Sequence, residues 1–217
     1  MGRPREFDVE TALDRATELF WQRGYEGTSV QDLVDALGVN RASLYATFGD
    51  KAQLFDAVLD RYQGWVDASI GQALAPPAAG AEAIRAYFSV LVARATRKAG
   101  PRGCLVLNTV TGGATAPVEI QRRVRAAIEA TTAQILQALA RDPELADRPD
   151  LSALARFFAA EGHGLSILAR AGVPPQELER AAKVALSVLG SAPPLKRGTE
   201  RSARPAAGRR RRVGSSL

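Results

Sequence analysis

The chain has few side chains of the kinds that perform catalysis or hold metals. Its 217 residues include one cysteine, Cys104, and one histidine, His163. A zinc site of Cys or His type needs several such ligands, and a nucleophile needs a neighbouring base. His163 has no serine, thiol or paired carboxylate near it in a recognisable catalytic arrangement. We therefore predict that the chain is not an enzyme and uses no metal or cofactor.

Two interpretations stay open for each of these residues. Cys104 follows Arg102 and precedes a short apolar run that predicts a helix, and both neighbours favour a reactive thiolate. The alternative is a small buried side chain that only fills space. His163 lies between two glycines on a predicted helix, where it could hydrogen-bond a ligand, lie in a dimer seam or be a structural histidine.

A short helix predicted from residue 41 has a small polar face suited to DNA. Leu44 and Phe48 are four residues apart and mark its buried side. The short side chains opposite them let the helix enter a major groove about 12 Å wide, where a methyl group can touch a thymine methyl. Arg41 can reach a guanine or a phosphate, and Tyr45 a phosphate oxygen. The face comprises Arg41, Ala42, Ser43, Tyr45, Ala46 and Thr47.

Three other features bear on this interface. Lys51 begins the next helix, whose free N–H groups favour a phosphate, and the helix start at Thr28 and Ser29 offers the same arrangement. The alternatives are a plain surface aromatic for Tyr45 and a solvated hydroxyl for Ser43.

The segments around this helix predict a helix-turn-helix. Apolar residues spaced by three and four predict a helix from residue 9, capped by Asp8 and ending near Gly24. A T-x-x-Q pattern predicts a capping box of Thr28 with Gln31 at the start of the second helix. Gly38 suits a left-handed turn, and Asn40 suits the cap of the third helix.

Helical patterns continue along the rest of the chain. Asp50 and Gln53 predict the cap of a long helix that runs towards Leu74 before Pro76-Pro77 stops it. Further helical patterns cover 82–99, 104–110, 120–139, 150–171 and 175–189, and no segment alternates with period two. We predict an all-α fold with a helix-turn-helix domain over 1–52, a larger helical domain over 53–190 and a tail over 191–217.

The positive charge is concentrated in the tail. The chain has a formal charge of +6 and a pI near 10.0. Residues 191–217 alone contribute +7, whereas the first 51 residues net −3. The tail is rich in Pro, Gly, Ala and Ser, so we predict that it is disordered, either inert or in contact with DNA. An alternative function is therefore non-specific binding of nucleic acids or anions through this tail.

The helix-turn-helix segment resembles a known family. The runs 24–30 (GYEGTSV), 37–39 (LGV), 43–48 (SLYATF) and 51–55 (KAQLF) occur in an order and spacing similar to those of the TetR family of bacterial repressors. Where many members have histidine or another large residue before the phenylalanine, this chain has Thr47. By position, the resemblance implies that these residues face DNA: Thr28, Ser29, Gln31, Arg41, Ala42, Ser43, Tyr45, Thr47 and Lys51.

The resemblance also implies a larger C-terminal domain that binds an effector and dimerises. The last two predicted helices carry more apolar residues than one core face needs, in agreement with pairing to a second copy; the alternative is that both helices are internal. A pocket for a small molecule is implied, with Tyr62, Trp65, Tyr87, Phe88 and Phe157 as candidate lining residues or ordinary core. The G-C-L run at Cys104 looks like a subgroup in which some members sense oxidants or electrophiles.

The sequence thus predicts a dimeric transcriptional regulator, a repressor released from a pseudo-palindromic operator by a small-molecule effector. Its expected partners are double-stranded operator DNA, the effector and a second copy of the chain. The N-terminus lacks an apolar leader, and no stretch approaches the roughly 18 apolar residues of a membrane span, so we expect a cytoplasmic protein.

Overall fold

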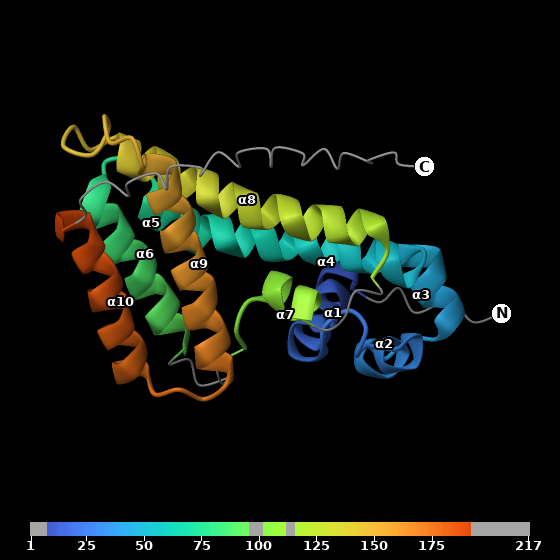
Figure 1. Cartoon of the computed structure of the whole chain (residues 1–217). Helices are drawn as coiled ribbons and strands as arrows, with labels where there is room; N and C mark the ends of the chain where they lie inside the picture. The colour runs from blue at the N-terminus through green and yellow to red at the C-terminus, as the bar shows by residue number, and fades with distance from the viewer. Residues whose placement is uncertain (1–7, 96–101, 112–115, 192–217) are drawn as a thin grey trace, which may run out of the picture.

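Every secondary-structure element in the described part of the chain is a helix, as the sequence predicts. The computed structural model describes residues 8–95, 102–111 and 116–191. In Figure 1, α1, α2 and α3 form a small lobe at one end and α6, α9 and α10 gather at the other. The elements are α1 (Val9–Arg23), α2 (Val30–Leu37), α3 (Arg41–Phe48), α4 (Lys51–Val66), η1 (Asp67–Gly71), α5 (Gln72–Leu74), α6 (Gly80–Ala95), α7 (Leu105–Thr111), α8 (Val118–Ala140), α9 (Leu151–Arg170) and α10 (Pro175–Ser191).

Local signals set most helix ends in the small lobe. Asp8, Asn40 and Asp50 cap α1, α3 and α4 through their side chains, as predicted. Gly38 has φ 69° and ψ 31°, the left-handed conformation expected of the turn between α2 and α3. The lobe closes over a buried core in which the rings of Phe20 and Phe55 meet edge to face, 4.8 Å apart.

The predicted capping box of α2 is wrong by one residue. Ser29, not Thr28, is the N-cap, and its hydroxyl accepts a hydrogen bond from the backbone N–H of Asp32. The Asp32 carboxylate in turn accepts from the backbone N–H of Ser29 at 2.8 Å. Thr28 is fully buried, and its hydroxyl donates to the carbonyl oxygen of Gly24 at 2.8 Å. Burial of the threonine methyl therefore selects the serine as the cap.

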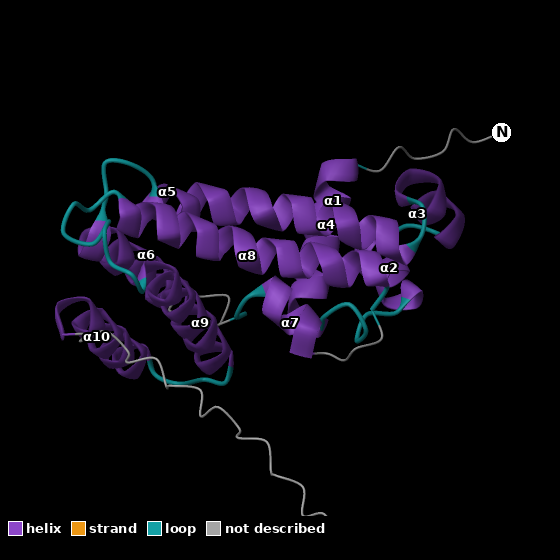
Figure 2. Ribbon diagram, turned by 45° about the horizontal axis from the view of Figure 1, so that its top comes forward, coloured by secondary structure: helices purple, strands orange, loops and turns teal. Residues whose placement is uncertain are grey.

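One long helical run connects the two ends of the molecule. α4 continues through the π-helical turn η1 into α5, which ends at Leu74 just before Pro76, as predicted. α8 lies alongside α4 in both ribbon views (Figures 1 and 2). Arg123 on α8 pairs with Asp56 at 2.6 Å and with Asp60, both on α4. The predicted boundary at residues 52 and 53 falls in the first turn of α4.

The second lobe is a bundle of α6, α8, α9 and α10. α9 packs against α8 and α6, and α10 packs against α6 and α9. Its core includes Ile84, Phe88, Ile135, Leu139 and Phe158, all with about 1% exposure or less. The predicted tail over 191–217 lies outside the described residues apart from Ser191, which ends α10. No described helix is both long enough and apolar enough to cross a membrane.

Candidate DNA interface and effector cavity

The exposed face of α3 is the face that the sequence predicts. Leu44 is fully buried and Phe48 packs against the core, so the opposite side of the helix faces solvent. Tyr45 is 42% exposed, which is unusual for a large aromatic side chain. Ser43 is half-buried. The exposed members of the face are Arg41, Ala42, Tyr45, Ala46 and Thr47.

The predicted contacts at the start of α2 divide into three cases. Ser29 is exposed at the N-cap. Gln31 is exposed, and its amide donates to Asp35 at 2.8 Å. Thr28 is buried and is bonded to Gly24, so its side chain supports the turn and does not face solvent. We therefore assign Thr28 a positioning role.

Lys51 lies at the first turn of α4 and is held by an aromatic ring. Its Nζ lies 4.1 Å from the centroid of the Tyr25 ring, within the range of a cation–π contact. Burial lowers the pKa of Lys51 below its ordinary value, while the nearby Glu26 carboxylate opposes this shift. The ring therefore fixes the ammonium beside the amino end of α4, where a phosphate would be favoured.

Ion pairs orient α2 and α4 against α1. Arg23 at the end of α1 pairs with Asp32 of α2 at 2.7 Å. Arg61 of α4 pairs with Glu10 at 2.7 Å and with Asp14 at 2.6 Å, both on α1. The two carboxylates raise the pKa of Arg61 further above its ordinary value. These pairs join α1 to α2 and to α4.

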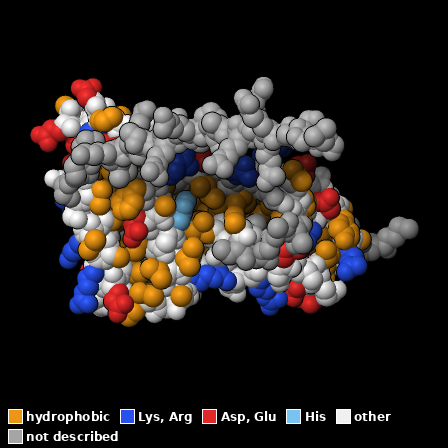
Figure 3. Space-filling model, in the orientation of Figure 1, with side chains coloured by type: hydrophobic (Ala, Val, Ile, Leu, Met, Phe, Trp, Pro, Cys, Tyr) orange, Lys and Arg blue, Asp and Glu red, His pale blue; other side chains and the backbone are white. Residues whose placement is uncertain are grey.

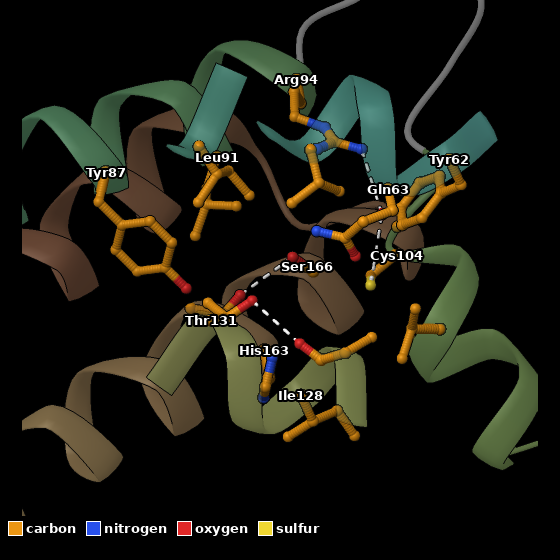
Figure 4. A pocket seen from close by; sticks show the side chains of 16 residues that line it. Tyr62, Gln63, Tyr87, Leu91, Arg94, Cys104, Ile128, Thr131, His163 and Ser166 are labelled. Atoms are coloured by element: carbon orange, nitrogen blue, oxygen red, sulfur yellow. Dashed lines mark hydrogen bonds between the residues drawn. The ribbon is translucent and has the colours of Figure 1, made fainter. Parts of the chain in front are cut away.

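A small polar cavity lies between the long helices of the second lobe. It has a volume of about 40 Å³, room for a few water-sized groups. Figure 4 shows the side chains that α4, α6, α8 and α9 direct into it, with Cys104 from the segment before α7. The polar lining residues are Tyr62, Gln63, Tyr87, Arg94, Cys104, Thr131, His163 and Ser166.

The predicted pocket residues do not all meet here. Tyr62 and Tyr87 line the cavity, as expected. Trp65 instead lies against Trp21, with the ring centroids 5.8 Å apart and the planes tilted by 33°, and is 42% exposed. Phe88 is a core residue in edge contact with Phe158. Phe157 is 40% exposed on α9. Phe88 is one residue along α6 from Tyr87, about 100° round the helix, and does not line this cavity.

The sequence analysis missed Arg94, Gln63, Thr131 and Ser166 as lining residues. A signal for one of them was present. Tyr87, Leu91 and Arg94 follow the i, i+4, i+7 spacing of one face of α6. Arg94 is thus a cation on the same helical face as Tyr87 and Leu91, and this pattern could have predicted it as a lining residue.

Cys104 contacts the cavity through its sulfur. The Tyr62 hydroxyl donates to Sγ at 3.4 Å, and burial raises the pKa of Tyr62 well above its ordinary value, so this donor stays protonated. Arg102 pairs with Glu18 and lies over the Trp21 ring. The expected support of the thiolate by Arg102 is therefore not what the structure shows; the neighbouring donor is Tyr62.

His163 is a half-buried residue of the cavity wall. Burial lowers the pKa of its imidazole, so the neutral form is favoured at pH 7. Among the described residues, no group of three or more His, Cys, Asp and Glu side chains is placed to hold a metal ion.

Comparison with known proteins identifies the family. The sequence model described as "Bacterial regulatory proteins, tetR family" matches residues 12–58, which contain the whole helix-turn-helix. The "HTH-type transcriptional repressor ComR" of Escherichia coli (strain K12) is 35% identical over 189 residues, 85% of this chain and 90% of ComR. The chain belongs to the TetR family.

Other TetR-family proteins agree in both sequence and architecture. The regulator YezE of Bacillus subtilis (strain 168) is 32% identical over 193 residues, which cover 87% of this chain and 100% of YezE. A cysteine mutant of the regulator CifR, solved in complex with 26bp double-strand operator DNA, has a TM-score of 0.78 and 34% identity. That alignment covers 86% of this chain and 98% of CifR. These relatives are named as transcriptional regulators, not as enzymes.

In this TetR-family chain, a hydrogen-bonded junction ties the DNA-binding lobe to the C-terminal lobe. The carbonyl oxygen of Trp21, at the end of α1, accepts bonds from Asn108 Nδ2 at 2.9 Å and from Arg170 Nη1 at 3.2 Å. The same two side chains donate to the carbonyl oxygen of Arg102, and Arg170 also donates to that of Gln22. The junction is only two residues along the chain from Cys104.

The outer surface of the TetR C-terminal lobe is unusually apolar. Figure 3 shows hydrophobic side chains gathered over α9 and its neighbours. Phe157, Ile167 and Leu168 of α9 and Val184 of α10 are each between 40% and 69% exposed. An exposed apolar surface of this kind is typical of a protein–protein contact.

Proposed function

We propose that the chain is a dimeric repressor that binds a pseudo-palindromic operator through two copies of α3 and leaves it when a small molecule binds in the C-terminal lobe. The observation that carries the proposal is the solvent-facing side of α3, with short side chains around an exposed Tyr45. Membership of the TetR family, and relatives that are repressors or were solved on operator DNA, support it. Its place of action would be the cytoplasm, with the DNA.

Each predicted DNA-facing side chain has a role that its position supports. Ala42 and Ala46 allow close approach to the groove floor, and Arg41 and Thr47 lie at the edges of the same face. Tyr45, Ser43 and Lys51 are placed for phosphate oxygens, together with Ser29 and Gln31 at the start of α2. Thr28 acts through the turn that it holds.

Dimerisation would run through α9 and α10. One recognition helix covers only a few base pairs, whereas two related by a two-fold axis read half-sites about 34 Å apart or a multiple of that. The apolar residues Phe157, Ile167, Leu168 and Val184 supply the surface that a second copy would cover. Size-exclusion chromatography with light scattering tests this: Leu168→Asp should yield a monomer with weaker operator binding, and an unchanged dimer would contradict the assignment.

The effect of ligand binding would be transmitted to the DNA-binding lobe by α4 and by the junction at Trp21. Tyr62 and Gln63 of α4 line the cavity, while Lys51 begins the same helix at the DNA-binding lobe. A ligand that separates α4 from α6 or α9 would therefore change the spacing of two reading heads. Moving the equilibrium from 1:99 to 99:1 requires a preference of about 10⁴-fold for one state.

The test begins with selection of bound sequences from a random DNA pool, followed by titration of the selected operator. The repressor function predicts a pseudo-palindromic consensus and loss of its binding in Tyr45→Ala and Lys51→Ala. Sequence-specific binding that survives both substitutions would overturn the proposal. A compound screen for release from that operator then tests the effector step.

The salt dependence of DNA affinity separates the repressor function from the alternative function, which is non-specific binding through the basic tail. Residues 191–217 carry a net +7, so their deletion should weaken binding to all DNA alike and flatten the dependence of affinity on salt. Under the repressor function, the preference for the selected operator over random DNA stays unchanged. Loss of all binding on deletion would favour the alternative.

A role for Cys104 as a thiol sensor is tested by alkylation. The thiol borders the cavity and accepts a hydrogen bond from Tyr62, so a reagent that enters the cavity would meet it. A sensor should react with iodoacetamide in the native state far faster than a buried thiol. A native rate that matches a buried thiol would leave Cys104 as a packing residue.

A further inference from the structure

We propose that the cavity between α4, α6, α8 and α9 binds a small monocarboxylate, with the carboxylate on Arg94 and its apolar body against Leu91. The inference names the ligand class of the effector site and rests on the proposed function only for the consequence that binding would have on DNA. Arg94, Leu91 and Tyr87 form one wall, because positions i, i+4 and i+7 share a face of α6.

Arg94 is a cation without a carboxylate partner among the described residues. Its one hydrogen bond there is a long one, from Nη2 to the Tyr62 hydroxyl oxygen at 3.4 Å. The guanidinium lies 5.5 Å from the Trp21 ring centroid and 5.9 Å from that of Tyr62, so two rings restrict its orientation. A guanidinium has five N–H donors, and the other described residues offer those of Arg94 no further hydrogen-bond partner. An oriented fork of this kind matches a carboxylate.

Four other arginines of the described chain have the acidic partner that Arg94 lacks. Arg61, Arg102, Arg123 and Arg148 each pair with an aspartate or glutamate. Arg94 lies in the last turn of α6, where the helix end offers only a partial negative charge. A half-buried cation that borders a cavity is therefore left for an anion to neutralise.

Tyr87 supplies an independent sign of a ligand. The residue is 1% exposed, its side chain lines the cavity, and its hydroxyl has no hydrogen-bond partner among the described residues. Figure 4 shows this hydroxyl directed into the cavity between α8 and α9. The hydroxyl can therefore donate a hydrogen bond to a ligand or water atom in the cavity. Gly162 makes room for the hydroxyl, since a Cβ there would lie 1.9 Å from it.

The remaining walls of the cavity indicate the charge, polarity and size of the ligand. Apolar side chains surround the polar groups, and a single cation balances one negative charge. The hydroxyls of Thr131 and Ser166 bond to carbonyl oxygens of their own helices. A cavity of about 40 Å³ favours a small molecule over a drug-sized one. The apolar lining residues are Val66, Ile70, Leu91, Val106, Ala127 and Ile128.

Isothermal titration calorimetry in a carboxylate-free buffer tests the proposal. The probes are acetate, butyrate and benzoate, each against its amide, which keeps the shape and removes the charge. We expect at least one acid to bind at least tenfold more tightly than its amide. Arg94→Gln should weaken that acid by at least tenfold, Arg94→Lys should weaken it less, and Tyr87→Phe should weaken it several-fold. Arg122→Gln, an exposed arginine on α8, should have no effect.

The controls keep every outcome interpretable. The melting temperature of each unliganded variant shows whether the cavity is still folded, and Arg94→Lys supplies a charged variant if Arg94→Gln unfolds. Equal binding of acid and amide, undiminished binding by Arg94→Gln, or no binding by any acid would overturn the inference. An acid that binds at Arg94 without releasing the operator would leave the site standing and overturn the proposed release. Operator binding is measured separately, so the two failures are distinguishable.

Discussion

The DNA-binding lobe and the cavity of the C-terminal lobe are both built from helices but position their important side chains in different ways. The lobe uses short, individually capped helices to present α3 to solvent, and its important side chains are neighbours in sequence. The cavity collects side chains from four long helices and the segment before α7, and it hides them. A surface that meets a rigid partner needs precise local geometry, whereas a cavity that responds to a ligand needs walls that belong to separate elements and can move apart.

The largest expected effect is a loss of operator affinity when the exposed face of α3 is changed. Tyr45→Ala should reduce operator affinity by at least about 100-fold, because a dimer loses two hydrogen bonds to charged groups at about 1.5–3 kcal/mol each. Tyr45→Phe removes the hydroxyl alone and should reproduce most of the loss. Fluorescence anisotropy with the selected operator measures both. Wild-type affinity in Tyr45→Phe would show that the ring, not the hydroxyl, makes the contact.

A substitution in the cavity should act on stability instead. Gly162→Ala places a Cβ 2.6 Å from Tyr87 Cζ and 2.9 Å from Leu91 Cδ1, so the wall of α6 must shift. Overpacking of this kind costs about 1–3 kcal/mol. Thermal unfolding measures the loss. Gly64→Ala on α4 is the matched control, because no atom lies within 4 Å of its Cβ and helix propensity favours alanine by about 1 kcal/mol. Equal effects of the two would contradict the packing argument.

The junction between the two regions can be weakened without touching either site. Arg170→Ala removes the bonds to the carbonyl oxygens of Trp21, Gln22 and Arg102. We expect amide hydrogen exchange at the end of α1 to rise by about tenfold, with little change in exchange in the core of α9. Arg156→Ala, which removes only a surface ion pair with Glu129 at 3.3 Å, is the control. Unchanged exchange at α1 would show that the junction is not a mechanical link.

The smallest expected effect is on the stability of the DNA-binding lobe in acid, and it comes from the charge of the Asp32 carboxylate. The Ser29 hydroxyl, the Ser29 backbone N–H and the Arg23 guanidinium hold the pKa of Asp32 below its ordinary 3.8. A depressed pKa adds stability above pH 3.8 that is lost as the pH falls through the folded value. The melting temperatures of wild type and Asp32→Asn should therefore differ at pH 7 and converge as the pH falls below 3.8 and through the lower pKa of the folded state. A difference that persists in acid would exclude the carboxylate as its source.

Much of the DNA-binding lobe could be predicted because its signals are local. Asn40, Gly38 and Asp50 act on backbone groups within three or four residues, so their roles follow from sequence spacing. The one error, Thr28 in place of Ser29, arose because both are good caps. Only the packing of the Thr28 methyl in the turn selects between them.

The cavity could be predicted only in part, because whether a side chain faces it depends on neighbours that are far away in the chain. Tyr62 and Trp65 are both aromatic on α4, yet only the first lines this cavity. Arg94 becomes notable only when no carboxylate from another helix reaches it.

By itself, the sequence determined that the chain is helical, where most of its helices begin and which face of α3 is free. Helix periodicity and capping depend on contacts a few residues apart, which any reader of the chain can see. The tertiary structure decided which polar groups share a cavity, which apolar residues stay exposed on α9 and α10, and how Trp21 joins the two lobes. These depend on contacts between residues as far apart as Trp21 and Arg170, which only the packed chain brings together.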